Sequence, residues 1–297
     1  MVCLSVSWHL LKYRISKAVG CKYMRRRVHG NLMDLPLKRE GITYPLAVFG
    51  IREELETEIV QKAIKPGMTA VDLGANIGYY TLMLAKGVTP GGKVYAIEPF
   101  AENFELLKRN IHANGYDGIV ELSKLAVSDK RGMTELFIGT GDNVHSIIDH
   151  FGNKQGSVEV ETMTLSDFQE GRRSFDFVRM DIEGAEVLAV NGMKKMFRNG
   201  HFPVIFFEIH TTGDKNPDPK YVQMLSRLHE TGYRSKYVIS AAKENSLPDF
   251  AEFGYRPEKI IHSGHALFSG LTPDDLMDLI PRRPRITRAI LFEYPRG

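Results

Sequence analysis

The chain has 297 residues, of which 43% are hydrophobic and 25% are charged, and its net charge is +3. These values are ordinary for a globular protein of one large or two small domains, and such a small net charge indicates no particular partner. Both cysteines, Cys3 and Cys21, lie near the N-terminus, so we expect no disulfide framework and no zinc site, and a reducing cytoplasm fits. No apolar run approaches the roughly 18 to 20 residues of a membrane span.

Basic residues gather at both ends of the sequence. Residues 1–30 contain no acidic residue but seven basic ones, Lys12, Arg14, Lys17, Lys22, Arg25, Arg26 and Arg27. Beyond residue 281, five arginines (282, 283, 285, 288 and 296) accompany a single acidic residue, Glu293. Such ends can bind anionic lipid or nucleic acid, or can form an ordinary solvated surface. Residues 1–23 mix apolar and basic positions, which permits a short amphipathic helix that lies on a partner or a membrane, or packs on the main domain.

In chain order, residues 31–65 predict two short strands, 32–37 and 42–49, and a helix over 53–64 that Pro66 and Gly67 terminate. From residue 68 the pattern alternates. Strands are predicted at 69–73, 93–97, 119–127, 133–138, 158–163, 175–180, 203–209, 233–239 and 265–268. Helices are predicted at 77–86, 101–114, 185–197, 219–231 and 273–280, with a loop over most of 241–262.

This alternation predicts a Rossmann-like α/β fold, in which helices cover both faces of a doubly wound, mostly parallel sheet of seven strands. Near-continuous apolar strands agree with it, because both faces of a parallel sheet are buried. We expect three regions: an N-terminal extension over 1–65, the main domain over 66–270 and a basic C-terminal tail over 271–297.

The strand at 69–73 runs into the turn Asp72-x-Gly74-x-Asn76-x-Gly78 and then a helix. Glycines let the chain turn sharply and let a ligand approach the backbone without a Cβ in the way. Glu98 closes the next strand, about 20 residues beyond the turn, where an acid can accept hydrogen bonds from both hydroxyls of a ribose. The alternative role for Glu98 is to cap the helix that follows.

The spacing of the glycines differs from the G-x-G-x-x-G pattern that cradles a pyrophosphate. The carboxylate of Asp72 is also unhelpful beside a pyrophosphate, whereas it suits the ammonium and sulfonium groups of S-adenosylmethionine. An NAD-type oxidoreductase on the same architecture is therefore disfavoured. A non-enzymatic module that docks on nucleic acid or membrane through its basic ends remains an alternative, but it leaves the acidic strand ends unexplained.

The turn together with Glu98 resembles the class I S-adenosylmethionine-dependent methyltransferases. A second block, running from Phe177 to Glu186 and followed by Gly192 and by Phe206 to His210, resembles the FkbM family. Arg179 stands where that family usually has lysine. The resemblance covers roughly residues 50–210 and implies O-methylation of a hydroxyl, on a sugar, a glycan or a secondary metabolite. The residues expected to bind the cofactor are Asp72, Gly74, Asn76, Gly78, Glu98, Asn103, Ala126 and Asp181.

Transfer of a methyl group to an alcohol is an in-line displacement that needs a positioned base. The candidates for catalysis lie at the ends of the fourth and fifth strands: Asp181, Glu183 and His210. Asp181 could instead hold a divalent metal, helped by Glu183 or Glu208, although nothing in the sequence requires one. The polar loop 139–156, with Asp142, Asn143, His145 and Ser146, is either a specificity loop or a plain connection. The sequence contains no strong nucleic-acid signal and names neither the acceptor nor the oligomeric state.

Overall fold

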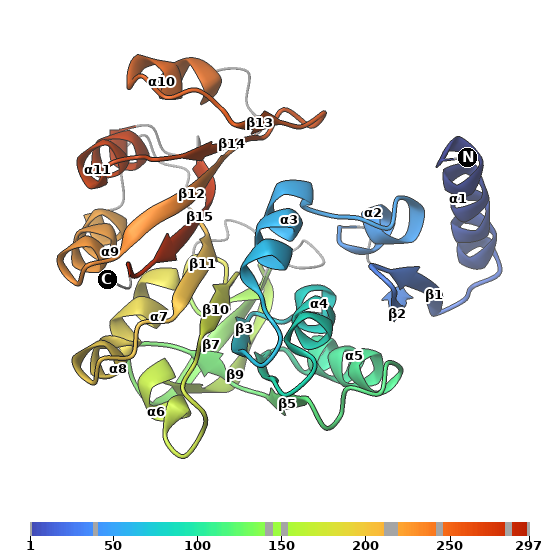
Figure 1. The fold of residues 1–297 in the computed structure, drawn as a ribbon. Helices are drawn as coiled ribbons and strands as arrows, with labels where there is room; N and C mark the ends of the chain where they lie inside the picture. Colours follow the sequence, from blue (N-terminus) through green and yellow to red (C-terminus); the bar gives the residue numbers. More distant parts are fainter. Residues whose placement is uncertain are drawn as a thin grey trace.

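The fold is built on a nine-stranded sheet in the order β13-β14-β12-β15-β11-β10-β3-β4-β5 (Figure 1). The computed structural model describes residues 2–37, 41–139, 145–149, 154–210, 219–241, 246–282 and 287–295. The strands of this sheet are β3 (Thr69–Leu73), β4 (Lys93–Ile97), β5 (Val120–Ser123), β10 (Phe177–Met180), β11 (Val204–Glu208), β12 (Arg234–Ser240), β13 (Lys259–Ile260), β14 (Ala266–Ser269) and β15 (Thr287–Glu293).

The five strands from β5 to β11 are parallel, whereas β15 is antiparallel to both of its neighbours, β11 and β12. These seven strands form the predicted doubly wound sheet, and β14 and β13 extend it at one edge. The winding changes direction between β3 and β10, because β4 and β5 follow on one side of β3 and β10 and β11 lie on the other. A ligand site is expected at the carboxyl ends of the strands at this point.

The segment expected to be a basic tail belongs to the sheet. β15 lies between β11 and β12, with Phe206 paired to Leu291 and Val238 paired to Ile290. The run of four consecutive buried apolar residues, 289–292, fits a strand that is covered on both faces, whereas the arginines had suggested an exposed tail. The prediction of a tail over residues 271–297 was therefore wrong.

Two hydrophobic cores cover the two faces of the sheet. One core contains residues of α3 (Glu54–Ala63), α4 (Tyr79–Val88) and α5 (Ala101–His112). The other contains residues of α6 (Leu165–Gln169), α7 (Glu186–Gly192), α8 (Lys194–Arg198), α9 (Pro219–Glu230), α10 (Ser246–Glu252) and α11 (Pro273–Arg282). Successive side chains of a strand point to opposite faces, so Ala70 joins the first core while Val71 and Leu73 join the second. α10 and β13 occupy the stretch that we expected to be a loop.

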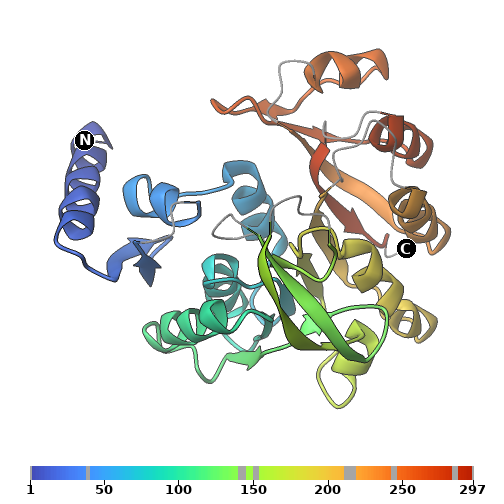
Figure 2. The same cartoon turned by 180° about the vertical axis from the view of Figure 1, so that it is seen from behind.

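A four-stranded sheet is inserted between β5 and β10 (Figure 2). It has the order β6-β9-β7-β8, with β6 (Ala126–Val127), β7 (Gly132–Gly139), β8 (His145–Ser146) and β9 (Lys154–Met163). Its own core is small and contains Ala126, Leu136 and Val160. Because β6 follows directly after β5, this sheet lies beside the carboxyl ends of the main strands. Asp142 and Asn143, which we considered for specificity, lie outside the described residues.

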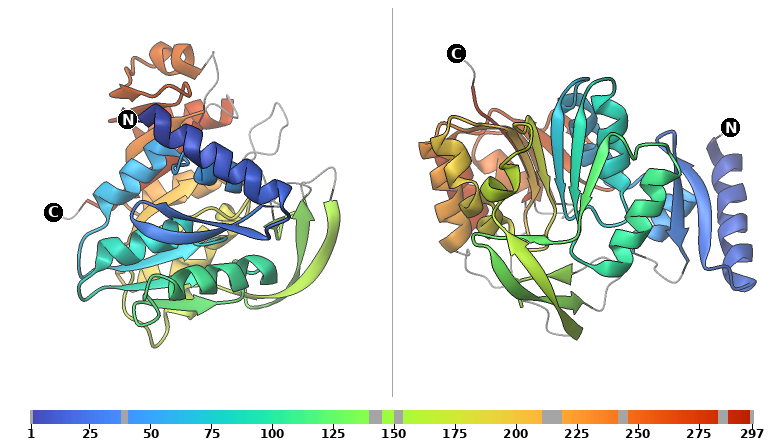
Figure 3. Two further views of the ribbon diagram at one scale, coloured as in Figure 1. Left: turned by 90° about the vertical axis from the view of Figure 1, so that its right-hand side faces the viewer. Right: turned by 90° about the horizontal axis from the view of Figure 1, so that it is seen from below.

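The N-terminal extension contains α1 (Val2–Ala18), β1 (Tyr23–Val28), β2 (Asn31–Pro36) and α2 (Thr43–Val48). The hairpin of β1 and β2 docks on α5, where Asp34 pairs with Arg109 at 2.9 Å and its backbone N–H donates to Asn110 Oδ1 at 2.8 Å. α1 lies at one end of the molecule, with the hairpin and α2 between it and the central sheet (Figures 1 and 3).

Residues 42–49 were expected to be a strand, but they form helix α2. Pro45 lies in the first turn of this helix, where the missing N–H of a proline leaves no bond unmade. Across the described residues, the helices are too short or too polar to cross a bilayer.

Candidate active site

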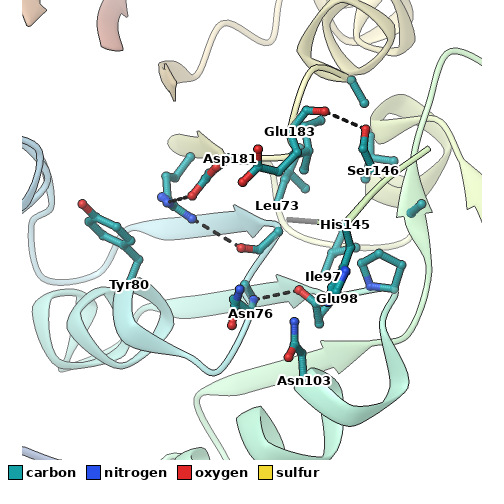
Figure 4. Close-up of a pocket in the computed structure, with 18 of the residues that line it drawn as sticks. Leu73, Asn76, Tyr80, Ile97, Glu98, Asn103, His145, Ser146, Asp181 and Glu183 are labelled. Atoms are coloured by element: carbon teal, nitrogen blue, oxygen red, sulfur yellow. Dashed lines mark hydrogen bonds and ion pairs between the residues drawn. The ribbon is translucent and has the colours of Figure 1, made fainter. Parts of the chain in front are cut away.

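A cavity of about 840 Å³, counting the part open to solvent, lies at the carboxyl ends of β3, β4 and β10 (Figure 4). This is the point where the winding of the sheet changes direction. One side of its wall carries Asn76, Glu98 and Asn103, and another carries Asp181 and Glu183. Three of the strand ends that were predicted to form a site, those of β3, β4 and β10, are therefore brought together here.

The first glycine of the turn after β3 is required by the neighbouring strand. Gly74 has a φ of +73°, and a Cβ on it would lie 1.9 Å from the backbone oxygen of Asp181. The sequence suggested that a ligand approaches this glycine, but the group that approaches it is the backbone just after β10. Gly78, with a φ of +95°, precedes the first residue of α4, and a Cβ on it would lie 2.8 Å from Leu107 Cδ1. Both glycines shape the turn, and of the two only Gly74 lines the cavity.

Glu98 is the buried acceptor on the β4 side of the cavity. Its two carboxylate oxygens accept the backbone N–H groups of Asn76 at 2.8 Å and Phe100 at 2.9 Å. Burial raises the pKa of Glu98 to about 7, although these bonds and one from the side chain of Asn103 oppose the shift. A carboxylate has about four acceptor positions, so with three donors in place Glu98 can still accept one hydrogen bond from a ligand. The bond from Phe100 also shows that Glu98 holds the turn before α5, and the two roles coexist.

Asp72 does not form part of the cavity wall that the structure describes. Its carboxylate is fully buried beneath the turn, where it accepts from Thr81 Oγ1 at 2.6 Å and from Arg179 Nη1 at 3.2 Å. The expected direct contact between this carboxylate and a cationic cofactor is therefore not supported. The side chains of a strand alternate between its faces, and the guanidinium of Arg179 already balances the charge of Asp72.

Arg179 connects the two strand ends. Its Nη2 donates to Asp181 Oδ2 at 2.7 Å, and its guanidinium carbon lies 4.0 Å from the centre of the Tyr80 ring. The planar fork of an arginine can bond two carboxylates and stack on a ring at the same time, which a lysine ammonium does less well. Arg179 and Tyr80 both line the cavity and were not predicted as site residues. A charged residue inside the apolar run 177–180 was the available signal.

The turn after β10 directs two carboxylates toward the cavity. Glu183 has a φ of +51°, which is rare for a residue other than glycine, and Gly184 follows with a φ of +94°. Ser146 Oγ donates to the backbone oxygen of Glu183 at 2.6 Å, so β8 holds this turn from the inserted sheet. In Figure 4 the side chains of Asp181 and Glu183 lie beside each other and face Glu98 across the cavity. Strained backbone of this kind is typical of functional sites.

His210 lies behind these carboxylates. Its Nε2 is 3.6 Å from Asp181 Oδ1 and 3.5 Å from Glu183 Oε2, and its Nδ1 is 3.0 Å from Glu186 Oε1. Glu186 is fully buried and also accepts from Tyr221 Oη at 2.6 Å. Burial lowers the pKa of His210, but the three carboxylates outweigh it and hold the pKa well above its ordinary value. Of the three predicted catalytic residues, Asp181 and Glu183 line the described cavity wall and His210 supports them.

The two cavity carboxylates differ in their affinity for a proton. Burial opposes ionisation of Asp181, but the positive charges of Arg179, His210 and Arg52 lower its pKa below the ordinary value. Burial raises the pKa of Glu183 to about 7, with His210 opposing. One ligand atom from each of Asp181, Glu183 and His210 lies within 4.8 Å of the others, so this group could also hold a cation.

Comparison with known proteins identifies the family. The sequence signature described as the Methyltransferase FkbM domain matches residues 72–235, which is more than half of the chain. This protein belongs to the FkbM methyltransferase family. The match begins at Asp72 and ends in β12, so it covers every strand end that borders the cavity.

Two curated relatives match this chain over stretches shorter than the family match. A protein-L-isoaspartate O-methyltransferase of Aeropyrum pernix is 45% identical over 58 residues, which are 20% of this chain and 22% of the relative. Another from Methanothermobacter thermautotrophicus is 30% identical over 95 residues, which are 31% of this chain and 41% of the relative. A crystal structure of methyltransferase FkbM from Methylobacillus flagellatus aligns with a TM-score of 0.43 and 15% identity, over 84% of this chain and 53% of that one. The chain thus spans about half of that protein and less than half of the curated relatives.

The cofactor of this FkbM methyltransferase is S-adenosylmethionine, and the cavity suits it. Glu98 offers an acceptor for a ribose hydroxyl at the end of β4. Apolar side chains that can cover an adenine ring lie next to it on the wall: Ile97, Leu125, Ala126 and Leu136. The carboxylates on the β10 side suit the positive charges of the methionine part of the cofactor.

Further residues on the wall could not be predicted from local sequence. Arg52 and Glu53 come from the start of α3, and Tyr80 Oη donates to Glu53 Oε2 at 2.9 Å. His145 and Ser146, from the polar segment that we considered for specificity, form β8 and lie on the wall. The sequence alone offered no signal for Arg52 or Glu53, because their place on the wall depends on how α3 packs against α4.

Proposed function

We propose that this FkbM methyltransferase transfers the methyl group of S-adenosylmethionine to a hydroxyl oxygen of a sugar, a glycan or a secondary metabolite. The observation that carries the proposal is the pair of carboxylates, Asp181 and Glu183, on the cavity wall opposite Glu98. Carboxylate oxygens accept hydrogen bonds, so they complement an acceptor that carries neighbouring hydroxyl groups. They would repel an acceptor that is itself a carboxylate, such as the isoaspartyl group after which the two curated relatives are named.

When bound, S-adenosylmethionine supplies a methyl group on a positively charged sulfur. Glu98 and Asn103 hold the nucleoside end of the cofactor, and the turn from Gly74 to Asn76 borders it. Asp181 and Glu183 orient the acceptor hydroxyl, and most of the rate acceleration comes from this alignment of the reacting atoms. With the cofactor bound, the methyl group would pass from sulfur to the acceptor oxygen, the carbon–sulfur electron pair would stay on sulfur, and Asp181 and Glu183 would hold the acceptor oxygen in line.

Glu183 is the residue that we assign to remove the hydroxyl proton. Asp181 is a poor base because its Oδ2 is paired with Arg179 at 2.7 Å. His210, which the sequence also suggested, is set back from the wall and is surrounded by three carboxylates that favour its protonated form. We therefore assign His210 to positioning: its imidazolium keeps both cavity carboxylates in place. Proton removal by a placed side chain contributes about 10²- to 10⁴-fold to a rate.

The proposal is tested by incubating the purified protein with S-adenosylmethionine and a panel of sugars, polyols and an isoaspartyl peptide. Mass spectrometry identifies an acceptor that gains one methyl group. With that acceptor, Glu183→Gln should lower kcat at least about 100-fold while leaving the affinity for S-adenosylhomocysteine unchanged. Glu159→Gln, at an exposed glutamate of β9, should leave both unchanged.

Three results would contradict parts of this proposal. Methylation of the isoaspartyl peptide in preference to every hydroxyl compound would refute the acceptor class. An unchanged kcat in Glu183→Gln would refute the base. Loss of activity in EDTA, recovered by adding Mg²⁺, would show that a cation rather than the free carboxylate activates the hydroxyl.

A further inference from the structure

Helix α1 presents apolar side chains on two opposite faces. On its inner face Tyr13 is buried, and Val6 and Leu10 pack against the hydrophobic cluster to which α2 and the hairpin of the N-terminal extension contribute. On its outer face Trp8, Leu11, Ile15 and, just beyond the helix, Val19 are exposed to 63%, 49%, 53% and 69%. Packing within the chain explains the inner face and leaves the outer one without a function.

The four exposed residues form a single stripe. With 3.6 residues per turn, positions 8, 11, 15 and 19 fall within an arc of about 80° on the helix surface. The stripe lies on the element farthest out at this end of the molecule, beyond α2 and the hairpin (Figures 1 and 3). Single exposed apolar residues are normal, but a contiguous row of them on an outer helix marks a contact surface.

The charges beside the stripe all have one sign. Lys12 and Arg14 flank it on the helix, and Lys17 and Lys22 follow toward its C-terminal end; all four are exposed. Residues 1–30 contain no acidic side chain. Such a combination of a tryptophan, aliphatic side chains and flanking lysines is typical of a helix that lies in the plane of an anionic membrane surface.

We propose that α1 docks this protein on an anionic lipid bilayer, with Trp8, Leu11, Ile15 and Val19 inserted among the lipids and the basic residues at the head groups. Nucleic acid fits less well, because a phosphate backbone offers nothing to the apolar stripe. A second copy of the chain fits less well too. A symmetric contact through this stripe would bring Lys12 and Arg14 against the same residues of the other copy.

Trp8 is the only tryptophan of the chain, so its fluorescence reports on this helix alone. The intact protein is titrated with vesicles of phosphatidylcholine containing 30 mol% phosphatidylglycerol, chosen as an anionic probe, and with vesicles of phosphatidylcholine alone. We expect a shift of Trp8 emission to shorter wavelength and co-sedimentation with the anionic vesicles. Binding should weaken at least about tenfold on the neutral vesicles and when salt is raised to about 0.5 M.

Two double variants separate the contributions to binding while keeping the fluorescent probe. Leu11→Ser/Ile15→Ser should weaken vesicle binding at least about tenfold through lost apolar burial. Lys12→Gln/Arg14→Gln should weaken binding on anionic vesicles by a similar factor and leave binding to neutral vesicles unchanged. The matched control is Ile260→Ser on β13, at a residue that is 53% exposed like Ile15 and should have no effect. Affinity for S-adenosylhomocysteine should be the same in all variants, which checks folding.

The proposal is overturned if anionic vesicles neither shift the emission nor sediment the protein. It is also overturned if Leu11→Ser/Ile15→Ser binds vesicles as well as the control does. A salt-sensitive emission shift with RNA but not with vesicles would assign the surface to nucleic acid instead. A dimer seen by light scattering that the Leu11→Ser/Ile15→Ser change abolishes, without vesicle binding, would assign it to a second copy.

Discussion

Two buried charged residues, Glu98 and Arg179, define the site in different ways. Arg179 is paired with Asp72 and Asp181, so its positive charge is balanced within the protein. These ion pairs fix the ends of β3 and β10 relative to each other. Glu98 is held only by neutral N–H donors, and its charge has no cationic partner among the described contacts. The arginine therefore builds the site, whereas the glutamate is left to meet a ligand.

Binding of the cofactor should depend on pH through Glu98. Its pKa is about 7 without cofactor, and a ribose hydroxyl would donate to the ionised form, so we expect the cofactor to favour the deprotonated group. Affinity for S-adenosylhomocysteine should consequently fall about tenfold as pH is lowered from 8 to 6, measured by calorimetry. Glu98→Gln should bind more weakly throughout and lose most of this dependence. The same slope in wild type and variant would show that another group titrates.

A methyl group at Gly74 should be far more harmful than one at a comparable glycine elsewhere. Gly115, just after α5, has a φ of +68° and no atom within 4 Å of a built Cβ, whereas the Cβ at Gly74 would overlap the Asp181 backbone. Both substitutions strain a left-handed residue, so Gly115→Ala should lower the free energy of unfolding by about 1 to 2 kcal/mol. Gly74→Ala should lower it by more than about 4 kcal/mol or prevent folding. If urea denaturation gave the same loss of unfolding free energy for both variants, the predicted clash at Gly74 would be contradicted.

Short elements that come from distant parts of the chain complete the site. β8 holds the turn after β10 through Ser146, and α3 brings Arg52 and Glu53 to the wall. β15 supports β11: the guanidinium of Arg288 lies 3.3 Å from Glu208 Oε2, at the end of β11, and also pairs with Glu53 and Glu56. β15 thus ties α3 and β11 together through Arg288.

Removing β15 should destroy the fold. A chain that stops at residue 286 loses the strand between β11 and β12, which exposes Phe206 and Phe207 and leaves unpaired strand edges on both sides of the gap. We expect this chain to be insoluble or to lack a cooperative unfolding transition, measured by circular dichroism. A chain that stops at residue 295 keeps β15 and should unfold like the full chain. Cooperative folding of the shorter chain would mean that the segment is a tail after all.

In the whole molecule, the cavity lies where the two halves of the sheet meet. Its wall combines residues of both halves, of the inserted sheet and of the N-terminal extension, from which Ile42 contributes. A ligand bound there contacts all of these parts and should therefore stabilise the molecule as one unit. α1 lies at the outer end, so its exposed stripe can meet another surface without covering the strand ends that border the cavity.

Cofactor binding should raise the thermal stability of the entire chain. At a concentration of 100 times Kd, S-adenosylhomocysteine should add about 2.7 kcal/mol to the free energy of unfolding and raise Tm by several degrees in scanning fluorimetry. NADH at the same concentration should have no effect, because the turn lacks the glycine pattern that cradles a pyrophosphate. Stabilisation by NADH and not by S-adenosylhomocysteine would support an oxidoreductase instead.

The sequence by itself determined those features of the fold and the site that depend on neighbouring residues in the chain. The bounds of β3 and β4 were predicted correctly, because a short apolar run and the turn residues after it specify a buried strand and its end. The positions of Glu98, Asp181 and Glu183 at strand ends followed, since the carboxyl ends of parallel strands share one edge. The family could likewise be predicted from two blocks of neighbouring residues.

Only the tertiary structure decided which side chains face the cavity and which strands are neighbours. Asp72 points away from the cavity to Arg179, and His210 is held by Glu186, because these contacts join residues 107 and 24 positions apart. β15 enters the middle of the sheet because its two edges pair with β11 and β12 and its two apolar faces join the two cores, a match that no local pattern contains. Periodicity predicts that a segment is a strand, but its neighbours depend on long-range packing and hydrogen bonding.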